Sequence, residues 1–264
     1  IVTHGSGAVE LYHNNNKKLE TTSTGVSVTG GIVGSTDATI NGLTVGKGGG
    51  NVSYNTAVGL NALAATATGA YNAGFGSSAL AALTSGTHNA AVGHVSLFKN
   101  TTGQYNTGLG TSALQENTTA SNNTAVGFSS LKLNTTGLNN VAVGSLALDA
   151  NTTANNSVAV GYQALTANTT GPENTAVGAY SLDSNTTGGG NTAIGYTALR
   201  EGNRSNNTAV GFEALRLGST GNNNTAVGRD ALTNNTGDNN TGLGYYALSA
   251  NTTGTLNTAV GANT

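Results

Sequence analysis

The chain of 264 residues contains no cysteine, methionine or tryptophan, and only one proline. Without cysteine it can form neither disulfide bonds nor thiolate metal sites. Cysteine usage therefore does not distinguish an oxidising from a reducing compartment. Charged residues make up 8% of the sequence, against roughly 25% in ordinary globular proteins, and the formal net charge is −2. This charge offers no footprint for nucleic acid or for an anionic membrane. No apolar run approaches the roughly 20 residues of a membrane-spanning helix.

Glycine is abundant instead, at 40 positions, and a short motif returns along the chain. The run Asn55-Thr56-Ala57-Val58-Gly59 recurs with small changes every 17 residues, as from Gly127 to Gly144, and the spacing falls to 16 only before Gly211 and Gly244. A fixed period of this kind is typical of solenoids, in which each unit buries its apolar face against its neighbours. The motif glycines are Gly59, Gly76, Gly93, Gly110, Gly127, Gly144, Gly161, Gly178, Gly195, Gly211, Gly228, Gly244 and Gly261.

Two apolar columns predict the core. Leucine stands four residues after each motif glycine from Gly59 to Gly244, as Leu131 and Leu148 do. An apolar residue stands directly before every motif glycine, as Val126 and Val143 do. Stacked at about 4.8 Å, these four side chains are expected to be buried together. The alternate strand position is always Ala or Gly, as at Ala125, and we expect this thin face to point outward and to contact another chain.

Polar residues predict how the coil turns. Asparagine opens nearly every motif, and stacked Asn side chains can form amide ladders along a solenoid. Asn-Thr-Thr-Gly segments, as at 134–137, predict the turns. The sequence therefore predicts an all-β protein, a parallel β-solenoid or β-roll of 16–17-residue rungs with two short strands per turn. Thirteen rungs, the last incomplete, would form a rod of about 60 Å.

The first fifty residues lack the period. Residues 9–22 predict a β-hairpin, and 25–30 and 38–46 two more short strands. So few large apolar residues are unlikely to build a core alone, which favours sharing one with identical chains. We therefore expect an N-terminal connecting and trimerising segment at 1–50 and a repeat domain at 51–264.

The segment 8–26 resembles one common in tail-fibre-like proteins of marine bacteriophages, and the Asn-Thr-Ala-Val-Gly units resemble the repeats that follow it there. The units are also similar to the head repeats of trimeric autotransporter adhesins. These resemblances imply a parallel homotrimer of β-rolls located in a virion tail fibre, or alternatively on the bacterial cell surface.

No residue pattern predicts catalysis, a cofactor or a metal site. The glycine-rich segment 108–113 is simply the repeat with Ala changed to Gly, and no helix is predicted after it. The four histidines share no metal-ligand spacing. We therefore expect no enzyme activity.

Two aromatic columns stand out. Tyr54, Tyr71 and Tyr105, with His88 between them, predict an aromatic ladder at one end of the roll. The second column follows the glycine and tolerates arginine, so we expect it to face solvent, where it could contact glycans; packing between chains is the alternative. Its aromatic members are Phe128, Tyr162, Tyr196, Phe212 and Tyr245.

Near-identical repeated units are typical of a scaffold, whereas an active site is single and asymmetric. The sequence predicts a structural segment of a phage tail fibre, a rigid spacer that could also bind a glycan or protein on the host surface. Neither nucleic-acid binding nor membrane insertion is expected. A bacterial adhesin head is the alternative, and an ice-binding solenoid, suggested by the threonine pairs at 101–102, 118–119 and 135–136, is a third.

Overall fold

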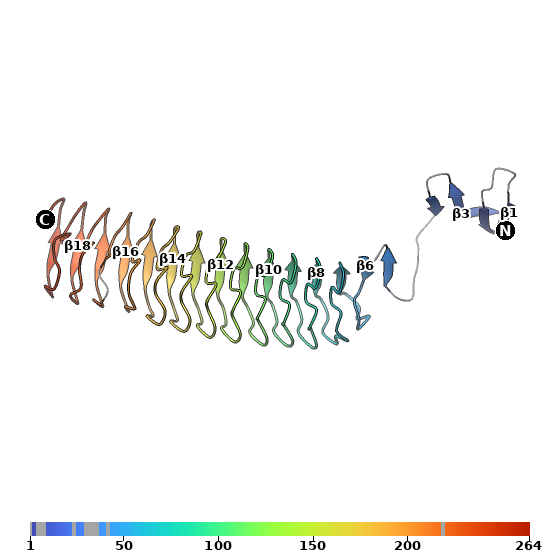
Figure 1. Cartoon of the computed structure of the whole chain (residues 1–264), viewed down its shortest axis with the longest axis horizontal. Coiled ribbons are helices and arrows are strands. Elements are labelled where there is room, and N and C mark those ends of the chain that lie inside the picture. Colours follow the sequence, from blue (N-terminus) through green and yellow to red (C-terminus); the bar gives the residue numbers. More distant parts are fainter. Residues whose placement is uncertain (1, 4–8, 23–24, 29–36, 41–42, 218–219) are drawn as a thin grey trace. The chain divides into compact units, whose positions relative to one another are not determined.

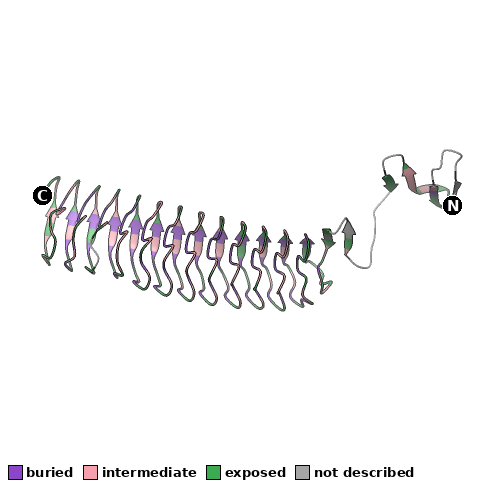
Figure 2. Ribbon diagram, in the orientation of Figure 1, coloured by how far each residue is buried: buried purple, intermediate pink, exposed green. Residues whose placement is uncertain are grey.

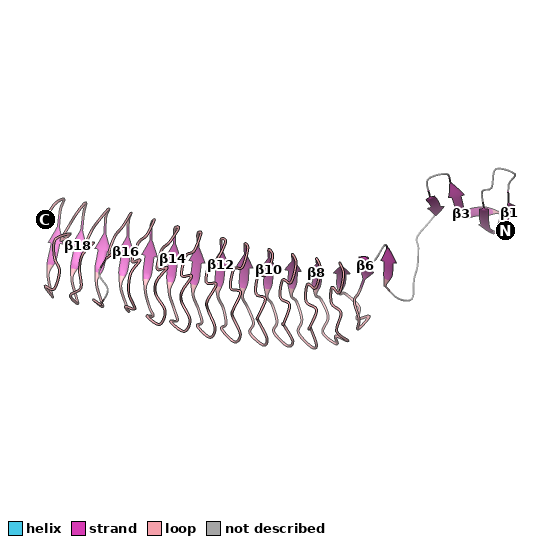
Figure 3. Ribbon diagram, in the orientation of Figure 1, coloured by secondary structure: helices cyan, strands magenta, loops and turns pink. Residues whose placement is uncertain are grey.

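A computed structural model describes residues 2–3, 9–22, 25–28, 37–40, 43–217 and 220–264. These residues form strands, turns and irregular segments, without a helix (Figures 1 and 3). The chain divides into two compact units, Ile1–Thr36 and Asp37–Thr264. The boundary thus falls before the hairpin that precedes the repeat, whereas the sequence suggested residue 50.

The first unit contains a four-stranded antiparallel sheet in the order β1-β2-β3-β4. The predicted hairpin is confirmed, because β2 and β3 pair across Asn14 and Asn15, whose φ angles of 52° and 61° suit a tight turn. The predicted strand 25–30 forms over Gly25–Val28, and its last two residues lie outside the described part. The bounds are β1 (Val2–Thr3), β2 (Val9–His13), β3 (Asn16–Thr22) and β4 (Gly25–Val28).

The second unit is a parallel β-solenoid, as predicted. Thirteen three-residue strands, β7 to β19, stack in parallel and in register, so that Ala125 pairs with Ala142 and Val126 with Val143. The strands are β7 (Thr56–Val58), β8 (Ala73–Phe75), β9 (Ala90–Val92), β10 (Thr107–Leu109), β11 (Thr124–Val126), β12 (Val141–Val143), β13 (Val158–Val160), β14 (Thr175–Val177), β15 (Thr192–Ile194), β16 (Thr208–Val210), β17 (Thr225–Val227), β18 (Thr241–Leu243) and β19 (Thr258–Val260).

An antiparallel hairpin covers the N-terminal edge of this sheet. It consists of β5 (Ala38–Ile40) and β6 (Leu43–Gly46), and β6 pairs antiparallel with β7. The sequence predicted a single strand here. The carboxylate of Asp37 accepts hydrogen bonds from the backbone N–H of Lys47 (2.6 Å) and Gly48 (2.7 Å), which fixes the passage from the hairpin into the first rung.

The predicted orientation of the strands is wrong. The central Ala or Gly of each strand points into the coil, and Ala125 and Ala142 are fully buried, whereas Val143 is 36% exposed. Leu131 and Leu148 are buried as expected. Buried residues therefore recur at the centre of each strand from β7 to β18, next to more exposed ones (Figure 2).

The narrow coil explains why small residues point inward. A Cβ added to Gly242 would lie 3.1 Å from Cγ of Leu232, so the space between strand and leucine admits an alanine and little more. The second small column, three residues after each motif glycine, is also buried, as at Ala147 and Ala164. The thin faces therefore lie inside one chain and do not provide a contact between chains.

Each rung contains one strand and not the predicted two. The side opposite the strands is made of turns, and every leucine four residues after a motif glycine has a positive φ, 48° for Leu131 and 50° for Leu148. Left-handed backbone costs an L-residue roughly 1–2 kcal/mol, whereas burying a leucine side chain contributes about 1.5–3 kcal/mol. Burial of the leucine side chain therefore slightly outweighs the cost of its backbone conformation. The backbone still bonds from rung to rung, since Leu148 N–H donates to the carbonyl of Ala164 at 3.0 Å.

The motif glycine is required by both conformation and space. At Gly161, φ is +136°, and an added Cβ would lie 2.6 Å from the carbonyl oxygen of Gly178 in the next rung. Real Cβ atoms do not approach a carbonyl oxygen so closely. The same close approach recurs along the stack, which explains why this column never varies.

Two buried asparagine ladders confirm the prediction of amide ladders. In the first, the Asn123 side chain accepts from Asn140 N–H (2.9 Å) and donates to the Gly137 carbonyl (2.8 Å). In the second, Asn134 donates to Asn117 Oδ1 (2.9 Å) and to the same Gly137 carbonyl (3.0 Å). The two ladders thus meet at one turn carbonyl and tie each turn to the adjacent rungs.

The inward orientation of alanine can be tested with one substitution at two positions. Ala142→Val would overpack the coil and is expected to lower the free energy of unfolding by about 1–3 kcal/mol. Ala90→Val is the matched control, because Ala90 occupies the outward column that holds Val141 and Val158, and its effect should stay within about 0.5 kcal/mol. Denaturant titration measures both. Equal effects would contradict the assigned orientation.

Asn134→Ala tests the ladders. It removes two donated bonds and leaves one amide N–H of Asn151, which donates to Asn134 Oδ1 at 2.8 Å, without its acceptor, while the bond from Asn151 to the Ala154 carbonyl remains. The expected loss is about 1–3 kcal/mol, because a buried polar group is left unpaired. The control is Thr153→Ala, whose exposed side chain forms no hydrogen bond within the described part of the chain. If both variants melt at the wild-type temperature, the ladders contribute nothing to stability.

Candidate functional surface

The predicted aromatic ladder forms at the N-terminal end of the solenoid. Tyr54, Tyr71, His88 and Tyr105 stack in that order, with centroid distances of 5.0, 4.8 and 4.9 Å and interplanar angles from 9° to 21°. Each has a positive φ just before the buried asparagine, which directs its side chain outward. Because the rings cover one another's faces, the ladder offers mainly ring edges to a ligand.

The second column is exposed along its length, as predicted. Phe128, Tyr162, Tyr196, Phe212 and Tyr245 all lie on the surface.

Two residues that the sequence analysis did not assign join this column. Tyr180 stands edge-on between Tyr162 (5.3 Å) and Tyr196 (6.1 Å), and Tyr246 stands edge-on against Tyr245 (4.5 Å). Both come from the next position along the rung. Counting aromatics in adjacent columns together would have found them.

The five predicted contact residues differ in how much ring face remains free. Phe212 is covered on both sides, by Tyr196 at 5.5 Å and by the guanidinium of Arg229 at 5.2 Å. Phe128 has no ring or guanidinium partner among the described residues and is strongly exposed. Sugars stack on ring faces, so Phe128 offers the more accessible platform and Phe212 the less accessible one.

The first threonine of each pair uses its hydroxyl group inside the chain. Thr118 Oγ1 donates to the Thr135 carbonyl at 3.1 Å, Thr135 Oγ1 to the Thr152 carbonyl at 3.0 Å, and Thr152 Oγ1 to the Thr169 carbonyl at 3.1 Å. The second threonine of each pair, as at Thr136 and Thr153, is exposed and its hydroxyl has no partner among the described residues. The ice-binding alternative therefore stays a prediction.

Arg204 is the most deeply buried charged residue in the described part of the solenoid. Arg204 replaces the small residue of the turn in the first 16-residue rung and is fully buried. Its Nη2 donates to the carbonyl of Leu215 at 2.9 Å and to that of Glu201. Desolvation lowers the pKa of Arg204 to about 10. Its side chain occupies the part of the coil where the second asparagine ladder is interrupted, between Asn185 and Asn235.

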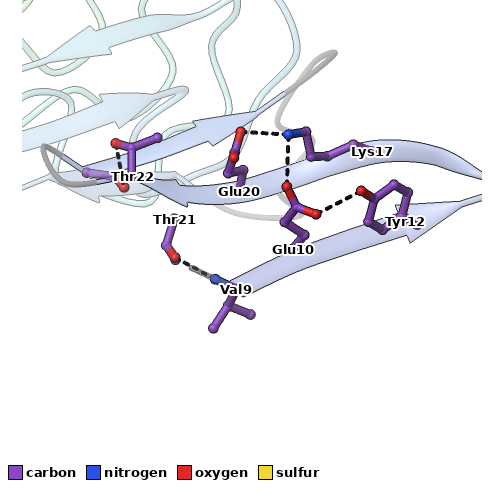
Figure 4. Close-up of polar contacts among 8 residues, drawn as sticks. Val9, Glu10, Tyr12, Lys17, Glu20, Thr21 and Thr22 are labelled. Carbon is purple, nitrogen blue, oxygen red and sulfur yellow. Dashed lines mark hydrogen bonds and ion pairs between the residues drawn. The ribbon is translucent and has the colours of Figure 1, made fainter. Parts of the chain in front are cut away.

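The N-terminal unit carries the densest charge cluster. Lys17 Nζ lies 2.9 Å from both Glu10 Oε1 and Glu20 Oε2, and the Tyr12 hydroxyl donates to Glu10 Oε2 at 2.8 Å (Figure 4). Hydrogen bonds to the two carboxylates raise the pKa of Lys17, and the bond to Glu10 raises the pKa of Tyr12. The cluster links β2 with β3 and closes their hairpin.

Neither the cluster nor the solenoid shows a metal centre. Across the described ranges, no group of three His, Asp or Glu residues is placed to hold a metal ion. Those same ranges contain no helix able to cross a membrane.

Comparisons with known proteins leave the geometry as the only guide to function. No family model, curated protein or solved structure matches this chain.

The exposed aromatics can be tested by comparing two phenylalanines of one column. If the column binds glycans, Phe128→Ser should weaken binding to a glycan array or to host cells by roughly two- to tenfold, the equivalent of about 0.5–1.5 kcal/mol for one aromatic contact. Phe212→Ser should change binding less, because both faces of that ring are already covered. Equal losses from the two variants, or none from Phe128→Ser, would remove the column as a stacking platform.

Proposed function

We propose that this chain is a stiff, non-catalytic segment of a fibre, foremost a bacteriophage tail fibre, in which parallel homotrimers act as a spacer. One observation carries the proposal: thirteen rungs repeat the same backbone pairing and the same interior without interruption by a different domain. Near-equal rungs set a length of about 60 Å, and a rod of fixed length is suited to act as a spacer between other parts of a fibre.

Internal bonding also favours a structural role. Most rung-to-rung contacts are backbone hydrogen bonds of 2.6–3.4 Å, and the turn amides are bonded as well, as in Thr135 N–H to the Thr152 carbonyl. A coil bonded in this way has few flexible segments for a protease to enter.

Host attachment is the second part of the proposal. The exposed aromatics at Phe128, Tyr162 and Tyr245 lie beside polar residues and are repeated along a rigid rod. Several weak contacts held on one frame reinforce each other, so trivalent display would raise avidity without a deep pocket. A head segment of a bacterial surface adhesin would use the same physical arrangement.

Light scattering and electron microscopy of the purified chain test this function. We expect three times the 25.9 kDa chain mass, rods with a repeat segment about 60 Å long, and slow cleavage by a broad-specificity protease. Binding to glycans or cells by the 51–264 repeat would assign it an adhesive part, whereas no binding would assign it the spacer role alone. A monomer at micromolar concentration, or rapid digestion of the repeat, would contradict the proposal.

A further inference from the structure

The outward face of the sheet β7–β19 is an uncharged stripe, in which a continuous column of aliphatic residues and Phe lies beside a column made mostly of Thr. Two residues of each strand point outward, which gives 26 positions for the thirteen strands, and every one is Thr, Ala, Val, Leu, Ile or Phe. No charge occurs among them, although the columns two positions before and two positions after the strands hold Glu173 and Arg229. Several side chains are notably exposed, including Phe75, Val92, Leu109, Ile194 and Leu243.

The stripe is large enough for a stable interface. Thirteen rungs span about 60 Å, and three extended residues span about 10 Å, which gives a footprint of roughly 600 Å². A standard interface buries about 800 Å² on each partner. The flanking columns widen the footprint toward that value.

The rung period identifies the partner that fits. Outward side chains such as Val126, Val143 and Val160 recur with the height of one rung, because the strands pair in register. Only a surface with the same period can remain in contact over thirteen rungs, and another copy of this chain provides one. A globular partner would meet a few rungs and leave the rest exposed.

The columns beside the stripe favour parallel packing. One border contains Tyr54, Tyr71 and Tyr105 in the first, second and fourth rungs. The other border contains its aromatics in later rungs, at Phe128, Tyr162, Tyr196, Phe212 and Tyr245. No rung carries Tyr or Phe at both borders, so in a parallel arrangement around an axis a large side chain on one copy faces a smaller one on the next.

We propose that copies of this chain associate through the outward face of β7–β19, parallel and in register, with the aromatic columns at the seams between them. In this arrangement the aromatic side chains pack between chains, which is the alternative to glycan binding. This inference rests on the proposed self-association and assigns it to a surface. It also explains why the stripe contains no charge, since an unpaired charge in an apolar contact is costly.

Charge insertion tests the surface. Val143→Glu combined with Val177→Glu places two carboxylates on the stripe, where an isolated chain leaves both positions 36% exposed and can tolerate them. The control is Thr153→Glu with Thr170→Glu, two exposed turn positions. Light scattering should give the monomer mass for the stripe variant alone, and circular dichroism should match wild type.

The outcomes separate the surface from the assembly. An oligomeric stripe variant would show that the chains meet elsewhere, and a monomeric wild type would refute self-association itself. If the stripe variant loses its secondary structure, single cysteines in the otherwise cysteine-free chain decide the question instead.

Single-cysteine variants also test whether the associated copies are parallel or antiparallel. Thr241 lies in the twelfth strand of the stack and Ala73 in the second, both on the stripe. With a mild oxidant, Thr241→Cys alone should form a disulfide-linked dimer, and Thr253→Cys, on the exposed turn, should not. An antiparallel arrangement would instead cross-link only a mixture of Thr241→Cys and Ala73→Cys chains. That result, or no cross-link in any combination, would overturn the proposal.

Discussion

The width of the coil interior is the constraint on which the structure depends. Strand and leucine lie so close together that the inward strand position accepts only Ala or Gly, and a Cβ at Gly74 already lies 3.5 Å from Cγ of Leu63. The backbone accommodates this narrow space by taking a positive φ at each leucine that follows a motif glycine by four residues. Adjacent rungs have equivalent residues at equivalent positions. The free-energy cost of the left-handed backbone, and the burial of leucine that offsets it, therefore recur from rung to rung.

Buried asparagine makes this interior specific. A core of Ala and Leu alone would tolerate rungs that slide, whereas a buried amide must find its partners in one register. Ser157 is an exception to the asparagine column of the first ladder. Its hydroxyl accepts from Asn174 N–H at 3.3 Å and so replaces the missing asparagine in that role. The ladders therefore fix register, while the leucines supply most of the apolar burial.

Much of this was predictable from the sequence, and the failures have physical causes. The period, the leucine column, the parallel class and the amide ladders all follow from residue spacing. The orientation of Ala125 and Val126 could not be predicted correctly, because the rule that larger apolar residues point inward assumes an interior with room for them. A left-handed leucine is also rare, so Leu131 suggested a second strand instead of a turn.

The same reversal changes the view of the outer surface. Once valine and threonine point outward, the apolar residues that seemed to form a core become a face available to another chain. The presence of Arg229 in the aromatic column predicted that the column faces solvent, and its aromatic members are exposed. Contacts such as Tyr180 against Tyr196 depend instead on side chains from neighbouring rungs. A single column of the sequence alignment does not contain that information.

Thiol labelling tests the central claim that alanine faces in and valine faces out. Ala142→Cys and Val143→Cys place one thiol each at adjacent positions of the same strand, in a chain with no other cysteine. With a water-soluble maleimide, the thiol at 142 should stay protected at every protein concentration until the chain unfolds. The thiol at 143 should react, and faster as dilution separates any associated copies. Rapid labelling at 142 with dilution-independent protection at 143 would contradict the account.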